Sequence, residues 1–416
     1  MFDNKSLQLA SYGHLDYHYF QSFLNHFKNA SLVNLNGELL FSRDSELCST
    51  TTSRLVSYQI VKKYLKLNPG DIFITNDPEN GGYSYSKVFF ISALTENLFL
   101  IWSDDISQVQ FKIPLSPLVE AHKKNGMLWS AMIDPHPQKV VLSRFFEDQI
   151  EHYTSCFRAT PYLDFLSEPD FQQIWFKTCK DEFERQFDLR AQGQGDLSLK
   201  YHDKLIKMGL GIEEKQNQRT ITIDFSNTQF AEKMCAASHV IESAMIQEFV
   251  YHYKLHQFLS QPILNQIKLM MPPKSVVSKA HTTGEHNFEL QGVIRQMLKH
   301  LLLQLISNKK GEKFALKSEA QLNFVADSNV RAGFLLNESF SLEDLTQFFK
   351  PTTMSMKENN YHGEYVVKGA GLTLDTFYLY SEFDHNKRFI KINQKSIKSG
   401  RHQLKENDQL SIHWKL

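Results

Sequence analysis

Residues 69–90 read PGDIFITNDPENGGYSYSKVFF and are the most informative part of the chain. Residues 72–74 (IFI) form a short β-prone run, and residues 87–91 (KVFFI) form a second one. Between them, Asn-Asp-Pro at 76–78 and Asn-Gly-Gly at 80–82 mark consecutive turns, because Asn and Asp bond their own backbone and Gly accepts a positive φ. The stretch therefore predicts a strand, two turns and a second strand.

The glycine pair inside this stretch is open to two interpretations. Gly81 and Gly82 let the backbone approach a ligand or another strand closely. An Asn-Gly pair is also the ordinary way to reverse a chain between two strands. Because Asp77 stands beside the pair, the segment is either a structural turn or a loop that lines a ligand site.

The residues Gly70-Asp71, Asn76-Asp77-Pro78 and Gly81-Gly82 resemble the hallmark of the hydantoinase B/oxoprolinase family, G-D-x-x-x-x-N-D-P-x-x-G-G-x-H-x-x-D. Other blocks of the chain are similar to that family's blocks and come in the same order. They are ASLVNLNGELLF at 30–41, DLRAQ at 188–192, IDFSNT at 223–228 and LKENDQLSI at 404–412.

The resemblance implies an α+β fold of hydantoinase B type. Its parts are a mixed α/β N-terminal region (1–145), a mainly helical middle (146–310) and a β-rich C-terminal region (311–416). It also implies a small-subunit role beside an ATP-binding hydantoinase A-like partner. Such pairs couple ATP to the hydrolysis or carboxylation of a small molecule, for example a cyclic amide such as 5-oxoproline or hydantoin, and a divalent metal is a further family expectation.

The chain departs from the family where the metal is held. The family places a His and an Asp after the Gly-Gly pair, and a His-His-x-Asp block further on. Ser84 and Lys87 stand at the first two positions, and a gapless alignment puts Ser107, Gln108 and Gln110 in the later block. A protonated lysine has no lone pair to offer a metal. The sequence therefore predicts a lost or rebuilt site, and we assign no metal ligand to this chain.

Two functional hypotheses follow. In the first, the chain is an enzyme subunit in which Asp77 orients a substrate amide or carries a proton. In the second, it is a catalytically degenerate scaffold or binding protein of the same fold, because function resides in the site and not in the fold. The candidate substrate-binding residues of the first hypothesis are Asn76, Gly81 and Gly82, with His281 and His286 from the polar segment HTTGEHN.

The amino-acid composition narrows the classes of function that remain. The chain has 416 residues, of which 42% are apolar, enough for a large core. Lys plus Arg equals Asp plus Glu at 46 each, so no net field directs it to nucleic acid or to an anionic membrane. Neither a signal peptide nor a membrane-spanning stretch is recognisable. The four cysteines lack C-x-x-C spacing and are expected to be free thiols in the cytoplasm, and no phosphate-binding loop motif is present, so ATP is expected to bind a partner.

Periodicity predicts the elements along the chain. The pairs His14/His18 and His252/His256 are spaced as helical metal ligands would be, but without the H-E-x-x-H pattern we interpret them as structural or surface histidines. Prolines 114 and 117 and the Asp-Pro-His-Pro cluster at 134–137 are expected to break regular structure. Helices are predicted at 15–27, 49–65, most of 145–208, 230–258 and 289–306, and strands at 72–74, 87–91, 97–102, 220–225, 365–367, 372–380, 388–392 and 410–414.

Overall fold

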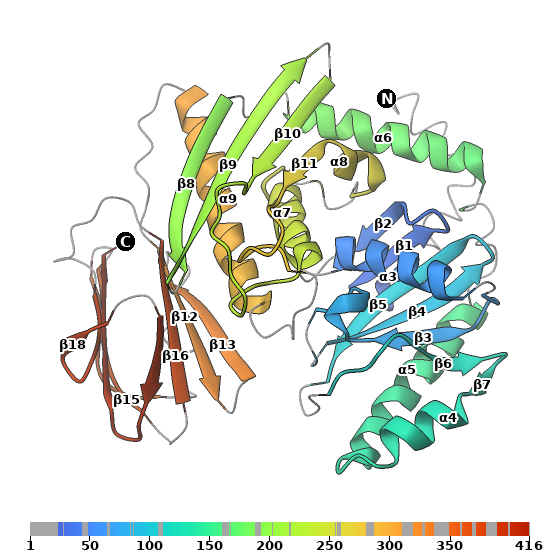
Figure 1. The fold of residues 1–416 in the computed structure, drawn as a ribbon, viewed down its shortest axis with the longest axis horizontal. Coiled ribbons are helices and arrows are strands. Elements are labelled where there is room, and N and C mark those ends of the chain that lie inside the picture. The colour runs from blue at the N-terminus through green and yellow to red at the C-terminus, as the bar shows by residue number, and fades with distance from the viewer. Residues whose placement is uncertain are drawn as a thin grey trace.

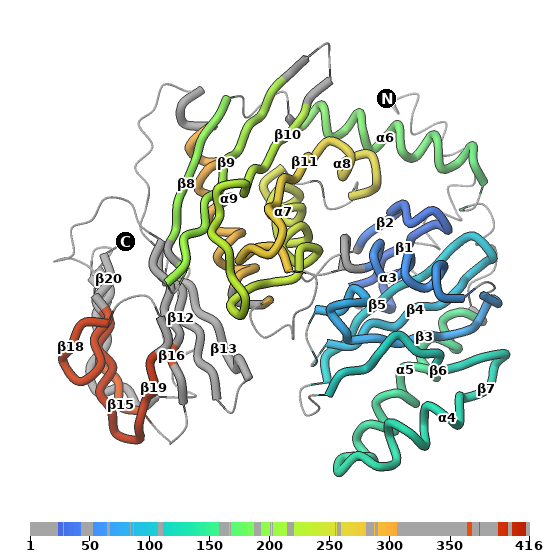
Figure 2. The backbone as a smooth tube through the Cα atoms, in the orientation of Figure 1, coloured from blue at the N-terminus to red at the C-terminus, as the bar shows by residue number. Residues whose placement is uncertain are grey.

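The computed structural model has an α+β fold, which confirms the predicted fold class (Figures 1 and 2). Its strands form a seven-stranded sheet, two four-stranded sheets and a five-stranded sheet. The division into three regions stays a prediction. The structure describes residues 24–27, 29–43, 49–64, 67–83, 85, 87–106, 111–159, 166, 168–187, 193–201, 203–215, 218–253, 255, 259–279, 287–309, 319–326, 329–336, 349–357, 360–367, 372–379, 389–397 and 400–415.

The N-terminal sheet carries the glycine-rich stretch. It is antiparallel throughout, with strand order β2-β1-β5-β4-β3-β6-β7. Strands 72–74, 87–91 and 97–102 of the sequence prediction are confirmed as β3, β4 and β5. The strand bounds are β1 Ala30–Asn34, β2 Leu39–Arg43, β3 Ile72–Thr75, β4 Lys87–Thr95, β5 Leu98–Asp105, β6 Ser116–Glu120 and β7 Lys123–Lys124.

Helices cover both faces of this sheet (Figure 1). Because side chains alternate along a strand, Phe89 and Ile91 of β4 face the core that contains helix α3 (Ser49–Lys63). Their neighbour Phe90 faces the opposite core, which contains helix α5 (Lys139–Ala159). The short α4 (Gly126–Leu128) and the π-helical turn η2 (Trp129–Ile133) lead into α5.

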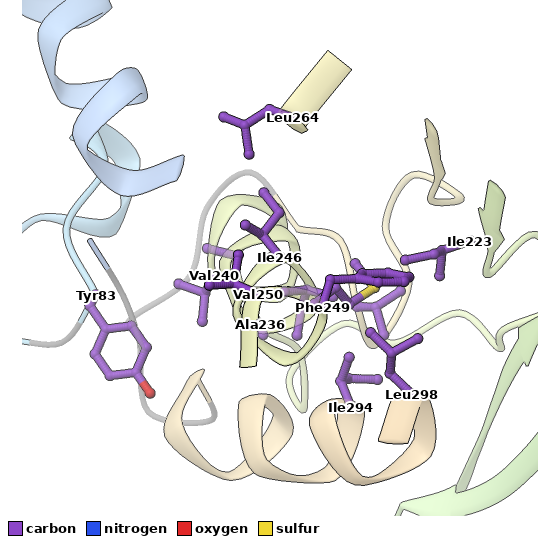
Figure 3. Packing of buried hydrophobic residues seen from close by; sticks show 14 of the residues in the cluster. Tyr83, Ile223, Ala236, Val240, Ile246, Phe249, Val250, Leu264, Ile294 and Leu298 are labelled. Carbon is purple, nitrogen blue, oxygen red and sulfur yellow. The ribbon is translucent and has the colours of Figure 1, made fainter. Parts of the chain in front are cut away.

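The middle of the chain forms a second sheet and two helices that pack together. Helix α7 (Ser238–Tyr253) lies between α3 and α9 (Asn287–Lys309), which packs on β8 and β9. Figure 3 shows Val240, Ile246 and Phe249 of α7 within this core, beside Ile294 and Leu298 of α9. The sheet has strand order β11-β10-β9-β8, and the elements are α6 Pro169–Phe187, β8 Gly193–Tyr201, β9 Lys204–Lys215, β10 Gln218–Asp224, α8 Gln261–Asn265 and β11 Ile267–Met270.

The C-terminal part is β-rich, as the sequence predicts. Its two sheets have the orders β13-β12-β16-β19 and β14-β15-β20-β17-β18. The predicted strands at 365–367, 372–380, 388–392 and 410–414 are confirmed as β15, β16, β17 and β20. The bounds are β12 Glu319–Ala326, β13 Asn329–Leu336, β14 Phe349–Lys357, β15 Asn360–Val367, β16 Leu372–Leu379, β17 Phe389–Ile392, β18 Lys395–Ser396, β19 Gly400–Leu404 and β20 Gln409–Lys415.

Helices α3 and α9 confirm the predictions at 49–65 and 289–306, whereas the prediction of helix through residue 208 is wrong from Gly193 onward. Residues 193–201 and 204–208 belong to the antiparallel pair β8 and β9. Leu199 and Tyr201 are both buried, and on β9 the buried residues are likewise two apart. The period is therefore two, and the glycines that interrupt the helical pattern lie against α9, where a side chain at Gly195 would meet Leu301.

Two other expectations need correction. Pro117 does not break regular structure, because it lies within β6 opposite Phe73, next to a register shift that accommodates it. The helix predicted over 230–258 begins only at Ser238, since the preceding backbone is bonded elsewhere: Ala231 N–H donates to the carbonyl of Lys274. The predicted helix 15–27 lies almost entirely outside the described residues.

Three cysteines are free thiols in the structure, namely Cys156, Cys179 and Cys235, whereas Cys48 lies outside the described residues. Burial raises the pKa of the Cys179 thiol to about 12, so this thiol stays protonated and unreactive at neutral pH. None of the helices within the described residues is long and apolar enough to cross a bilayer.

Candidate functional site

The 76–83 loop, which comprises residues 76 to 83, follows β3 and contains the single turn η1 (Pro78–Asn80). Asp77 caps the turn, because its Oδ1 accepts the N–H of Glu79 at 3.1 Å. Pro78 occupies the first position of the turn, where its fixed φ is suitable and its missing N–H has no partner to lose. The Asn-Asp-Pro sequence thus starts the turn through local chemistry, as predicted.

Each glycine of the pair is required for a different reason. Gly81 ends the turn with φ at 97°, a conformation that L-residues rarely adopt. At Gly82 there is no space for a side chain, since a Cβ would lie 2.2 Å from the carbonyl carbon and oxygen of Asn76. The close approach at Gly82 is therefore made to the protein's own backbone. Their predicted role in binding a substrate stays a prediction.

Asn76 is fully buried and uses its whole carboxamide to hold two neighbouring segments. Its Nδ2 donates to the carbonyls of Tyr85 and Phe111, each at 2.8 Å. Its Oδ1 accepts the N–H of Ile113 at 2.6 Å. Both N–H groups of the Asn76 carboxamide are therefore used within the protein, and neither is left to bind a substrate.

Asp77 is also buried, with 3% of its surface exposed, and its carboxylate is fully engaged. Oδ2 accepts a hydrogen bond from Asn80 Nδ2 at 2.8 Å and lies 3.1 Å from Lys112 Nζ. The same ammonium lies 3.5 Å from Glu79 Oε2. The hydrogen bond to Asp77 is the main reason that the pKa of Lys112 is raised, and the ammonium therefore stays charged.

The other end of the loop is bonded to the first turns of α7 and α9. His239 Nε2 lies 2.9 Å from the carbonyl oxygen of Gly82. Asn287 Nδ2 donates to the carbonyl of Tyr83 at 2.6 Å, and its Oδ1 accepts the N–H of Ala237 at 2.9 Å. The Tyr83 hydroxyl donates to Gln291, and Figure 3 shows it pointing toward the start of α9.

His239 is held neutral in this position. It is buried, and burial lowers the pKa of its imidazole, while the hydrogen bond to Gly82 acts in the opposite direction. A neutral ring can donate through Nε2 to the Gly82 carbonyl. Sequence reasoning missed His239, Asn287, Gln291 and Lys112, because no motif or spacing links them to the loop.

Several predicted positions lie outside the described residues. These include the candidate binding residues His281 and His286 and the replaced family position Ser84. Lys87 is described: it is buried at the start of β4, with Nζ 3.8 Å from Asp105 Oδ1. Others outside the described residues are Ser107, Gln108, Gln110, the 188–192 block, His14, His18 and His256.

The described residues of the loop do not fit a divalent metal. Within the described ranges no three His, Cys, Asp or Glu side chains form a group that could hold an ion. The two carboxylates of the loop, Asp77 and Glu79, converge on the ammonium of Lys112 instead. A hard divalent ion prefers six or more oxygen ligands, and an ammonium in their midst repels it.

Comparison with known proteins places the fold. No family model matches the chain, and no curated protein matches it in sequence. Among solved structures, it is similar to the ATP-dependent caprolactamase from Pseudomonas jessenii, with a TM-score of 0.62 and 8% identity over 98% of this chain and 90% of that one.

The likeness extends over nearly the whole fold of that enzyme as it is compared with this chain. A second similar structure is nucleotide-free acetone carboxylase, an enzyme of ATP-dependent acetone carboxylation, with a TM-score of 0.64 and 8% identity over 99% of this chain and 74% of that one. At this identity the likeness concerns the fold alone.

Proposed function

We propose that this hydantoinase-like chain is a catalytically degenerate scaffold subunit that assembles with an ATP-binding hydantoinase A-like partner in the cytoplasm. The observation that carries the proposal is the bonding of Asp77. Its carboxylate is buried and engaged by Glu79 N–H, by the Asn80 amide and by the Lys112 ammonium. The polar groups of the loop are used to build the fold.

The energy of these contacts argues against a chemical role for Asp77. Hydrogen bonds to a charged group contribute about 1.5–3 kcal/mol each. A carboxylate that turned toward a substrate would give up three of them, a loss of roughly 5 kcal/mol or more before any chemistry began.

The second candidate is an enzyme subunit that, with the same partner, couples ATP to the hydrolysis or carboxylation of a cyclic amide such as 5-oxoproline or hydantoin. It is favoured by the fold likeness, which spans 98% of the chain in the comparison with an ATP-dependent caprolactamase. In that case Asp77 is the catalytic residue. The substrate would be bound by Asn76, Gly81, Gly82, His281 and His286.

Reconstitution with a hydantoinase A-like protein from the same organism separates the two. We expect a stable complex on size-exclusion chromatography, and no ADP release that depends on hydantoin or 5-oxoproline. The Asp77→Asn variant, and the control Asp408→Asn at a distant turn, should form the complex and should likewise show no substrate-dependent ADP release. Failure to form a complex would contradict the scaffold role, and substrate-dependent ADP release that Asp77→Asn abolishes would establish the enzyme.

A further inference from the structure

We propose that Lys112 is a built-in counter-ion that takes the place of a bound cation beside the 76–83 loop and closes the loop to divalent metals. Its ammonium contacts two carboxylates of the loop, at 3.1 Å from Asp77 and 3.5 Å from Glu79. This role of Lys112 is independent of whether the chain takes part in catalysis.

The backbone on either side of Lys112 is held in place by the loop itself. Asn76 donates to the carbonyl of Phe111 and accepts the N–H of Ile113. The hydroxyl of Thr75 also donates to the carbonyl of Ile113, at 3.0 Å. Because the residues before and after it are bonded to the loop, the Lys112 side chain is positioned over Asp77. Asn76 is thus a positioning residue for the ammonium.

The charges explain why a cation is needed at this point. Asp77 has 4% of its side chain exposed, whereas Glu79 and Lys112 have 41% and 44% exposed. A buried carboxylate without a positive partner is strongly unfavourable, and its neutral neighbours, Asn80 Nδ2 and Glu79 N–H, supply only partial charges. Lysine brings one positive charge and three donors, enough to bond both carboxylates at once.

The same ammonium also excludes a metal. A divalent ion bound to Asp77 and Glu79 would require oxygens from both side chains. The lysine nitrogen lies within contact of one oxygen of each. Removing the ammonium while keeping the two carboxylates should therefore open a weak site for Mn²⁺ or Ca²⁺, in which Asp77 and Glu79 supply the ligands.

The test uses the full chain without a partner and measures the Tm in EDTA and in excess MnCl₂. We expect the Tm of the wild-type protein to be the same in both. Lys112→Met should lower the Tm in EDTA, and Mn²⁺ should restore at least half of the loss. The matched control is Lys124→Met, which breaks the exposed ion pair with Glu147; it should lower the Tm by less than half as much and show no Mn²⁺ response.

The neutral pair Asp77→Asn/Lys112→Met keeps the test decisive even if Lys112→Met fails to fold. Because both charges are removed and no unpaired carboxylate is left at the buried position 77, this double variant should fold with a Tm closer to wild type than that of Lys112→Met. It should not respond to Mn²⁺.

Three results would overturn the proposal: a wild-type protein stabilised by Mn²⁺, a Lys112→Met variant that keeps its Tm or gains nothing from Mn²⁺, or a double variant as unstable as the single one. All three are read on this chain alone, so they are independent of complex formation and of ADP release by the assembled pair.

Discussion

Two turns of this protein are organised by the same pair of residue types, an Asp and an Asn, and differ in what surrounds them. In the 76–83 loop, Asp77 accepts from a backbone N–H and from Asn80 Nδ2. In the C-terminal sheet, Asp408 accepts from the N–H of Lys405 and from Asn393 Nδ2, each at 2.7 Å. The local chemistry of the two turns is nearly identical.

The two turns differ in their surroundings. Most residues of the 76–83 loop are buried, and the loop is bonded to α7 and α9 through His239 and Asn287. The Asp408 turn is bonded to its own sheet, and the side chains of Asn393 and Lys405 are exposed. A turn can therefore be locally ordinary and yet hold the layers of the molecule together. Substitutions in the 76–83 loop should therefore lower the free energy of unfolding far more than matching substitutions in the turn at Asp408.

Gly82→Ala should have the largest effect. Its Cβ would lie 2.2 Å from the carbonyl carbon of Asn76 and 2.6 Å from the backbone nitrogen of Asp77, so backbone must move. We expect a loss of about 3 kcal/mol or more in the free energy of unfolding, measured by urea titration. The control is Gly126→Ala, where a Cβ meets nothing within 4 Å, and its effect should stay within about 0.5 kcal/mol.

Asn287→Ala tests the connection between the loop and the helices. It leaves the Tyr83 carbonyl and the Ala237 N–H without their partner in a buried region, at about 1–3 kcal/mol each. We expect a loss of about 2–3 kcal/mol in urea titration. The matched change in the second turn, Asn393→Gly, suits the left-handed backbone at φ 49°, exposes the former partners to water and should cost less than about 1 kcal/mol. Equal losses of unfolding free energy at the two positions would contradict the difference between the two turns.

The pH dependence of stability should reveal His239. Burial holds its folded-state pKa below the ordinary value of 6.5. As pH falls below 6.5 the unfolded chain binds a proton that the folded chain does not, so the stability present above that pH is progressively lost. His239→Gln keeps an N–H donor for Gly82 but does not titrate. Between pH 7.5 and 5.5 this variant should lose less stability than wild type, and parallel pH curves would contradict the assignment.

Asp408→Asn should give the smallest change. The pKa of the Asp408 carboxyl is lowered, first by the hydrogen bond from the Lys405 backbone and then by Asn393. Its contribution is present above the unfolded value of 3.8 and is lost as pH falls through the lower folded value. At pH 7 the variant should unfold at a slightly lower urea concentration than wild type, and the difference should shrink as pH falls below 3.8. A difference that persists in acid would exclude the carboxylate as its cause.

Elements defined by local patterns were predicted well. The helices α3 and α9 follow from apolar residues at helical spacing, and β3, β4 and β5 follow from β-branched and aromatic runs. The error at β8 and β9 arose because Gly-interrupted segments such as GQGDLSLKY fit neither period well when read alone. Their strands are stabilised by pairing with each other and by packing on α9, which no local pattern contains.

The turn of the 76–83 loop could be predicted from the amino-acid sequence, because Asp and Pro favour the start of a turn, Gly81 tolerates the positive φ at its end, and Gly82 has no side chain to obstruct the backbone. The residues to which the loop is bonded became visible only in the folded structure. His239 and Asn287 lie 157 and 204 positions from their partners in the chain, and such contacts exist only after the layers have packed. Local forces act through neighbours in sequence, whereas burial and charge pairing depend on neighbours in space.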